Sequence, residues 1–132
     1  MGKRRTGRKL AFQTLYQIDM RPEEHEKVIE RFILDGDIFV ETRDFALDLV
    51  KGAHKEIEHA DNIIKSQSID WDFDRINLVD KSILRLALYE INFTKTPVRV
   101  VIDEALELAK QFSTQDSPKF INGILGKYVE KK

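Results

Sequence analysis

Residues 77–93 read NLVDKSILRLALYEINF, and apolar side chains occur nearly all the way round the middle of this segment. A helix that is apolar on every side must be covered by other parts of the protein, whereas a surface helix keeps one polar face. Residues that favour turns are scarce in the whole chain, which has six Gly and three Pro. The segment therefore predicts a buried central helix in an all-α protein.

Helical periodicity also marks the segments on both sides of this central helix. Apolar residues recur at three- and four-residue intervals in residues 3–19, 23–34, 39–66, 98–111 and in the last segment after Pro118. Residues 39–66 are long enough that we expect a break within them. Residues 66–76, with Ile69, Trp71 and Phe73 among polar residues, are expected to form a connection in which Trp71 fills the core. Ser113 and Asp116 have the spacing of a capping box.

Length and composition describe one folded domain. The 132 residues are 42% hydrophobic and 34% charged, which is too apolar for a disordered chain. No apolar run is long enough to span a membrane, and no apolar segment follows the charged N-terminus as in a secretory signal. The chain has no cysteine, which excludes disulfides and thiolate chemistry. We expect a single cytoplasmic domain over residues 1–132.

Charge is distributed unevenly along the chain. Residues 3–9, KRRTGRK, hold five of the 22 Lys and Arg residues and no acid, which leaves 17 cations against 23 anions elsewhere. The five cations are Lys3, Arg4, Arg5, Arg8 and Lys9. A basic arm on an otherwise acidic domain is the asymmetry expected when one end meets a polyanion. Short basic N-termini without any such role are also common, so charge alone leaves both interpretations open.

Two aromatic residues lie on the same side of the first helix as part of this arm. At 100° per residue, Arg5, Lys9, Phe12 and Tyr16 fall within a narrow sector that is separate from the apolar stripe of the helix. Rings beside cations suit RNA, because bases stack on rings while phosphates pair with guanidinium groups. The alternative is that Phe12 and Tyr16 form a second core-facing side.

Patterns required for catalysis or metal binding are missing from the sequence. The glycines are scattered and form no phosphate-binding loop, and no serine has the context of a nucleophile. His54 and His59 are five residues apart, which does not place two metal ligands on one helix face, and His25 stands alone. We therefore expect no enzyme activity, no cofactor and no metal ion.

Three stretches resemble the NusB family of bacterial transcription antitermination factors. They are KRRTGRKLAFQTLYQID (3–19), VDKSILRLALYEI (79–91) and PVRVVIDEALELAKQFSTQDSPKFINGIL (97–125). Together they cover nearly half the chain, in the family's order and spacing. The resemblance implies an all-α fold of two three-helix bundles, packed roughly perpendicular in one compact domain. It also implies binding to the boxA element of nascent RNA together with NusE, a small-subunit ribosomal protein, in a complex that helps RNA polymerase resist termination.

The resemblance also assigns roles to individual residues. Lys3, Arg4, Arg5 and Arg8 with Tyr16 would face RNA, and Lys9 extends this basic arm where the family often has Glu. Arg85 in the central helix would lie close to the same surface. Phe112, Asp116 and Phe120 would sit where the family meets its protein partner and the adjoining RNA. Both Phe rings also fit the inward stripes of their helices, and Pro118 departs from the small or polar residue usual in that loop.

Two further functions are compatible with these residues. Some RNA cytosine methyltransferases carry a NusB-like domain, so the chain could be an accessory module for a separate modifying enzyme. It could also be a helical protein-interaction module whose arm has no RNA affinity. The family includes monomers and dimers, and the resemblance does not decide between them.

Overall fold

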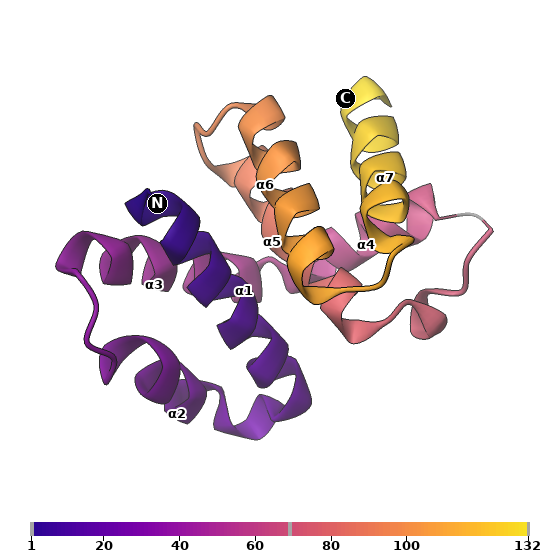
Figure 1. Ribbon diagram of the computed structural model, residues 1–132. Coiled ribbons are helices and arrows are strands. Elements are labelled where there is room, and N and C mark those ends of the chain that lie inside the picture. The colour runs from indigo at the N-terminus through magenta and orange to yellow at the C-terminus, as the bar shows by residue number, and fades with distance from the viewer. Residues whose placement is uncertain (1, 69, 132) are drawn as a thin grey trace. The chain divides into compact units, whose positions relative to one another are not determined.

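A computed structural model describes residues 2–68 and 70–131 of the chain (Figure 1). These residues form helices and turns, and no strand occurs among them, so the predicted all-α class is confirmed. The chain divides into two compact units, Met1–Lys55 and Glu56–Lys132. Within the described ranges, no helix has both the length and the apolar character needed to cross a bilayer.

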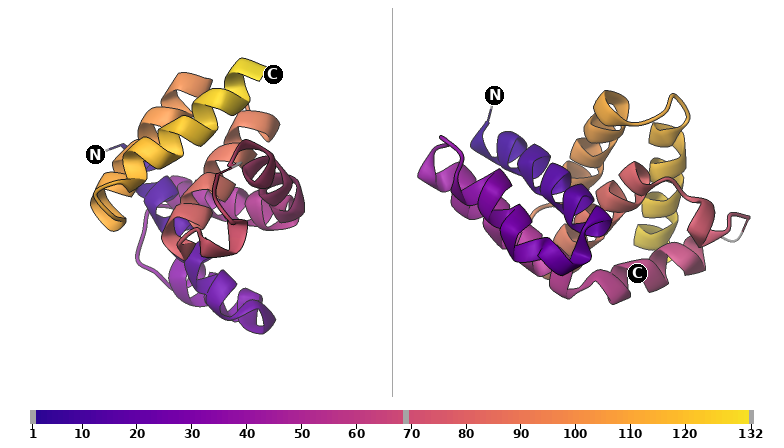
Figure 2. Two further views of the ribbon diagram at one scale, coloured as in Figure 1. Left: turned by 90° about the vertical axis from the view of Figure 1, so that its right-hand side faces the viewer. Right: turned by 90° about the horizontal axis from the view of Figure 1, so that it is seen from below.

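The first unit contains helices α1 (Lys3–Met20), α2 (His25–Ile29) and α3 (Val40–Lys55). Helix α1 ends at Met20 with Arg21 as its C-terminal cap, and Pro22 opens a short 3-10 turn, Pro22–Glu24, where its fixed φ suits the first helical position. Helix α2 continues as a π-helical turn, Glu30–Leu34. Helices α1 and α3 lie side by side in Figure 2 and form the most extensive helix packing of this unit.

The core of the first unit is formed by the apolar stripe that the sequence predicts for α1. Ala11, Leu15 and Ile18 are buried. They are joined in the core by residues of the other two helices and the π-helical turn: Val28, Ile33, Ala46, Leu49, Val50 and Ala53. The predicted break in residues 39–66 lies at Glu56, whose backbone leaves the helical conformation between α3 and the next helix.

The second unit contains α4 (Ile57–Gln67), α5 (Leu78–Phe93), α6 (Val98–Phe112) and α7 (Ser117–Lys131). Helix α5 has buried residues on all sides, as the sequence predicts, and it packs against each of the other three helices. Asn77 caps its start, because the Asn77 side-chain oxygen accepts a hydrogen bond of 2.8 Å from the Asp80 backbone N–H.

The connection between α4 and α5 differs from its prediction at one residue. A 3-10 turn, Phe73–Arg75, interrupts it, and Ile69 lies outside the described residues. Trp71 does not fill the core: its side chain is 61% exposed. The expectation was wrong: Ile76 is a buried apolar residue of this connection, whereas the Trp71 ring lies at the surface against the half-buried Phe120 ring.

The predicted capping box of Ser113 and Asp116 is also wrong. The Ser113 hydroxyl donates to Asp80 Oδ1 at 2.6 Å, and the Ser117 hydroxyl donates to Asp80 Oδ2 at 2.9 Å. Asp80, at the start of α5, is buried. A buried carboxylate needs donors, and these hydroxyls supply them. The Ser113 hydroxyl is therefore engaged by Asp80, 33 positions away in the sequence, and by the Ser117 hydroxyl at 2.8 Å, rather than by Asp116.

His25 and His54 stack in the first unit, although 29 positions separate them in the sequence (54 − 25). Their ring centroids are 4.9 Å apart. Burial, followed by the charge of His25, lowers the pKa of His54 below its usual 6.5. In the pH window below 6.5 the unfolded chain therefore binds more protons than the folded chain.

We expect the free energy of unfolding to rise with pH through this window and to level off above about 6.5, the ordinary histidine value. Urea unfolding between about pH 5.5 and 7.5 measures this dependence. His54→Gln should flatten it, and His59→Gln, an exposed histidine of the second unit, is the matched control. An unchanged pH dependence in His54→Gln would contradict the expectation.

Candidate nucleic-acid interface

The basic arm is the first turns of α1 rather than a free tail. Lys3, Arg4 and Arg5 are exposed, Lys9 is half-buried, and Arg8 is only 4% exposed. The five predicted cations therefore differ in their exposure to solvent. Three present their charge at the surface, whereas most of the Arg8 side chain is covered by the protein.

Two of these arginines lie over one aromatic ring of α3. The guanidinium carbon of Arg4 is 5.0 Å from the centroid of the Phe45 ring, and that of Arg8 is 5.3 Å away. An arginine over a ring face gains a cation–π attraction, and its planar group is held in a defined orientation. Phe45 therefore orients part of the arm.

Gly7 allows this arrangement. A Cβ atom at Gly7 would lie 2.7 Å from Cδ2 of Phe45, closer than atoms of this kind approach one another. Glycine within a helix costs about 1 kcal/mol relative to alanine. Here the missing side chain lets the Phe45 ring reach the α1 backbone between Arg4 and Arg8. Helices α1 and α3 can therefore pack closely at this point.

Lys3 of the arm pairs with an acid of α3. Its Nζ donates to Glu41 Oε2 at 3.3 Å, and both side chains are mostly exposed. A backbone hydrogen bond, followed by Lys3, lowers the pKa of Glu41. Ion pairs between exposed residues contribute little to stability. Lys3 can thus leave Glu41 for a phosphate group at little cost.

The aromatic residues predicted beside the arm have different environments. Phe12 is 3% exposed, so it belongs to the core, as the alternative interpretation has it. Tyr16, one helical turn further on, is half-buried. A half-buried ring can offer an edge or face to a ligand, so Tyr16 is the aromatic residue of this face that can contact RNA.

Arg85, in the second unit, forms a two-pronged ion pair. Its Nε donates to Asp61 Oδ1 at 2.7 Å, and its Nη2 donates to Asp61 Oδ2 at 3.0 Å. The side chains are only 10% and 20% exposed, respectively. Paired N–H groups that match a carboxylate are among the stronger hydrogen-bonded arrangements in proteins. Arg85 thus joins α5 to α4, a structural role that the family resemblance did not assign to it.

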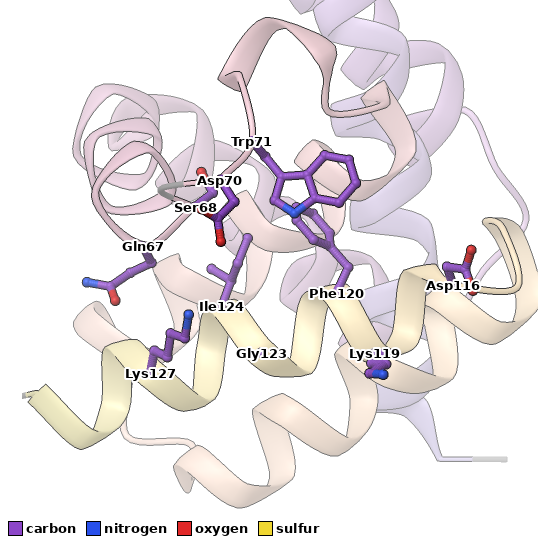
Figure 3. A pocket seen from close by; sticks show the side chains of 10 residues that line it. All are labelled: Gln67, Ser68, Asp70, Trp71, Asp116, Lys119, Phe120, Gly123, Ile124 and Lys127. Carbon is purple, nitrogen blue, oxygen red and sulfur yellow. The ribbon is translucent and has the colours of Figure 1, made fainter.

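The residues assigned to the protein partner lie around the turn between α6 and α7. Asp116 is exposed, and Phe112 and Phe120 are half-buried. The Phe120 ring meets the Trp71 indole edge to face, with centroids 5.7 Å apart (Figure 3). Two hollows adjoin this pair, with volumes of about 580 and 250 Å³, and both are lined by Trp71, Asp116 and Phe120.

Sequence reasoning missed the role of Phe45 and misplaced Trp71. Phe45 falls on the apolar side of its own helix, which gave no reason to pair it with arginines 37 or more positions away (45 − 8). Trp71 stands among aspartates in a polar connection, a position that is compatible with a buried or an exposed ring. No group of three or more His, Cys, Asp or Glu residues that could hold a metal ion occurs in residues 2–68 and 70–131.

Comparison with known proteins gives consistent matches along the chain. The model of the NusB family matches residues 5–130. The transcription antitermination protein NusB of Carboxydothermus hydrogenoformans is 44% identical over an alignment of 133 positions that covers 96% of this chain and 92% of that protein. A solved structure of T. maritima NusB has a TM-score of 0.88 at 33% identity and covers 99% of this chain and 92% of its own. A crystal structure of antitermination factors NusB and NusE in complex with dsRNA matches with a TM-score of 0.88 at 29% identity, covering 100% of this chain and 99% of its own.

Proposed function

The chain belongs to the NusB family, and on this premise we propose that it is a transcription antitermination factor. It binds the boxA element of nascent RNA together with NusE, within a complex that helps RNA polymerase resist termination. The observation that carries the proposal is the 44% identity to an antitermination protein over almost the full length of both chains. Residues 1–132 act as a single RNA-binding domain in this proposal.

The basic arm supports RNA binding independently of the family. Lys3, Arg4 and Arg5 are exposed at the start of α1, and Arg4 and Arg8 are oriented by the Phe45 ring. Protein cations that neutralise phosphates release counterions from the nucleic acid, which favours binding at low salt. In this proposal the exposed cations meet the phosphates, and Arg8 packs on the Phe45 ring that also orients Arg4.

NusE binding is assigned to the turn between α6 and α7. Phe112, Asp116 and Phe120 lie at this turn, where two half-buried rings flank an exposed acid. Aromatic side chains are common among the residues that dominate binding energy in protein interfaces. Arg85 contributes indirectly, because its ion pair with Asp61 holds α5 against α4.

A titration of labelled boxA RNA, with and without NusE, tests the proposed function. Fluorescence anisotropy should show binding that NusE strengthens, and an RNA of scrambled boxA sequence should bind more weakly. Equal affinity for both RNAs, with no effect of NusE, would mean that the chain is not an antitermination factor of this kind.

Tyr16→Ala is expected to weaken boxA RNA binding by about 1–3 kcal/mol, the usual contribution of a base stacked on an aromatic ring. Tyr16→Phe should retain most of the affinity, because it keeps the ring. Anisotropy measures the affinity, and a thermal melt measures the folded fraction. If the melting temperature falls sharply and the folded fraction binds RNA normally, Tyr16 is a core residue rather than a stacking surface.

Asp116→Asn should raise RNA affinity by up to about fivefold, since a unit charge near a phosphate in water interacts by about 1 kcal/mol. Among the described residues, no hydrogen bond or ion pair to the Asp116 carboxylate occurs, so its removal should leave stability nearly unchanged. Asp103→Asn, which removes an exposed acid of α6, is the matched control. Equal affinity changes in both variants would indicate a general effect of net charge.

A further inference from the structure

We propose that the Phe39 ring, at the start of α3, stacks on one unpaired base of the bound RNA. The site lies outside α1 and extends the RNA-binding surface by one nucleotide, next to Lys3. It deepens the proposed function and therefore rests on it. The residues that form it belong to the first unit.

Phe39 has the most exposed large apolar side chain in the described part of the chain. It is 72% exposed, and the next residue, Val40, is 54% exposed. Isolated apolar residues at a surface need no explanation, whereas neighbouring ones more often mark a place where something binds. Helices α1 and α3 bury their own apolar stripes against each other, and Phe39 remains outside that core.

The backbone of Phe39 is fixed, so the ring projects from a defined place. Its carbonyl oxygen accepts a hydrogen bond of 2.9 Å from the Arg43 backbone N–H, which is the pattern that begins a helix. Figure 1 shows α1 and α3 beginning at the same end of this unit. A ring that is already held in place loses less conformational entropy on binding than a ring on a mobile loop.

A cation of the basic arm lies over this ring. Lys3 Nζ is 5.6 Å from the centroid of the Phe39 ring, and Arg4 and Arg5 follow Lys3 on the exposed start of α1. Glu41 faces the same place, but its charge is balanced by Lys3 Nζ at 3.3 Å. Proteins that bind single strands combine aromatic rings for the bases with cations that follow the backbone. Phe39 and Lys3 supply both parts.

The charge around Phe39 favours RNA over a protein partner or a second copy of the chain. The core of a protein interface is depleted of charged residues, whereas Lys3 lies over this ring. In a two-fold dimer centred on Phe39, the cations of one copy would meet the same cations of the other and repel them. Phosphate groups supply the opposite charge.

Phe39 and Tyr16 are too far apart to bind the same base. Lys3, which lies over the Phe39 ring, and Tyr16 are 13 positions apart in α1 (16 − 3). At about 1.5 Å per residue, this separation corresponds to roughly 20 Å along the helix. The two rings therefore contact different nucleotides, and the contribution of each ring can be measured separately.

Anisotropy of labelled boxA RNA with variants of the full chain tests the site. Phe39→Ala should weaken binding by about fivefold to a hundredfold, which corresponds to the loss of one base stack. Phe39→Leu keeps an apolar side chain without a ring and should lose nearly as much, whereas Phe39→Trp should retain the affinity. The melting temperatures of these variants should stay within a few degrees of the parent, because the side chain is mostly exposed.

Abasic nucleotides show whether Phe39 acts through a base. In a set of boxA RNAs with one abasic position each, one position should weaken binding to the parent and have no further effect on Phe39→Ala. A different position should behave in this way with Tyr16→Ala. Phe93→Ala removes an exposed ring of the second unit, so it is the matched control and should leave RNA affinity unchanged.

Several outcomes would overturn the proposal in distinguishable ways. Normal RNA affinity in Phe39→Ala, or full affinity in Phe39→Leu, removes the stacking site and leaves the proposed function intact. A loss in Phe39→Ala that adds to the effect of every abasic position means that the ring contacts no base. Weaker self-association of Phe39→Ala in analytical ultracentrifugation, with unaltered RNA affinity, assigns the ring to a contact between copies. Absence of boxA binding by the unaltered chain, with and without NusE, overturns the proposed function and this site together.

Discussion

Replacing Arg4 and Arg5 together by glutamate is expected to weaken boxA RNA binding about a hundredfold, while the melting temperature falls by only a few degrees. Both side chains are exposed at the start of α1. A hydrogen bond to a charged group contributes about 1.5 kcal/mol or more, and the loss of two such contacts therefore corresponds to roughly two powers of ten in affinity. Exposed charges contribute little to folding, and the contact of Arg4 with the Phe45 ring contributes about 0.5–1 kcal/mol at an exposed site.

The salt dependence of RNA binding also tests whether the basic arm contacts phosphates. With about three to five phosphate contacts on a single strand, the logarithm of the binding constant should fall against the logarithm of salt concentration with a slope of about −2 to −3.5. The double variant should lose about 1.4 of that slope. Replacing Lys51 and Lys55 of α3 by glutamate makes the same change in net charge on exposed residues away from the arm. Equal weakening by both double variants would show that only net charge matters.

Arg8 is a poor choice for such a charge reversal, although its place in the sequence suggested that it was equivalent to Arg5. Its side chain is 4% exposed and lies over the Phe45 ring. A glutamate there would place a carboxylate in a largely covered position against an aromatic face, which costs stability. Charge reversal at Arg8 is therefore expected to lower the melting temperature more than charge reversal at the exposed Arg5.

Asp61→Ala is expected to lower the free energy of unfolding by about 3 kcal/mol, the lower part of the range for breaking a buried ion pair by removing one partner. The change deprives the mostly buried Arg85 guanidinium of the carboxylate that binds it at 2.7 and 3.0 Å. Urea unfolding measures the loss. Glu107→Ala, which breaks the exposed pair with Lys110, should cost no more than about 0.5 kcal/mol.

A double variant distinguishes this structural role of Arg85 from contact with RNA. Asp61→Leu combined with Arg85→Met replaces the ion pair by apolar side chains of similar size, which commonly restores stability. If Arg85 acts by holding α5 to α4, the double variant should bind boxA RNA nearly as well as the parent. A stable double variant with strongly reduced RNA affinity would assign Arg85 to the RNA surface. Unchanged stability in Asp61→Ala would show that the ion pair does not support the fold.

Helix positions were predictable because helical periodicity is a local property. Neighbours three and four positions apart create an apolar stripe, so the segment of α1 and the buried character of α5 could be inferred without the fold. Asn77, next to the start of α5, is a residue type that caps helices through its own side chain. The excess of cations in residues 3–9 likewise needs only the order of residues.

The environment of each polar or aromatic side chain depends on distant segments. Asp61 lies 24 positions from Arg85, and Asp80 lies 33 positions from Ser113, so neither partnership follows from local spacing. Trp71 illustrates the same limit: an apolar ring in a polar connection can be buried or exposed, and the ring that Trp71 contacts, Phe120, is 49 positions away in the sequence (120 − 71).

By itself, the sequence determined that the chain is helical, that α5 is central, that the N-terminus carries a basic cluster, and that three stretches resemble the NusB family. Only the tertiary structure decided which arm residues are exposed, how Arg85 is engaged and where an exposed Trp71 meets Phe120. The physical reason is that the apolar stripe of a helix depends only on residues three and four positions apart in the sequence. The exposure of a single charged or aromatic side chain depends instead on which distant segments pack against it. Gly7 is an example. The sequence shows that this residue has no side chain, but only the structure shows that the Phe45 ring packs against the backbone there.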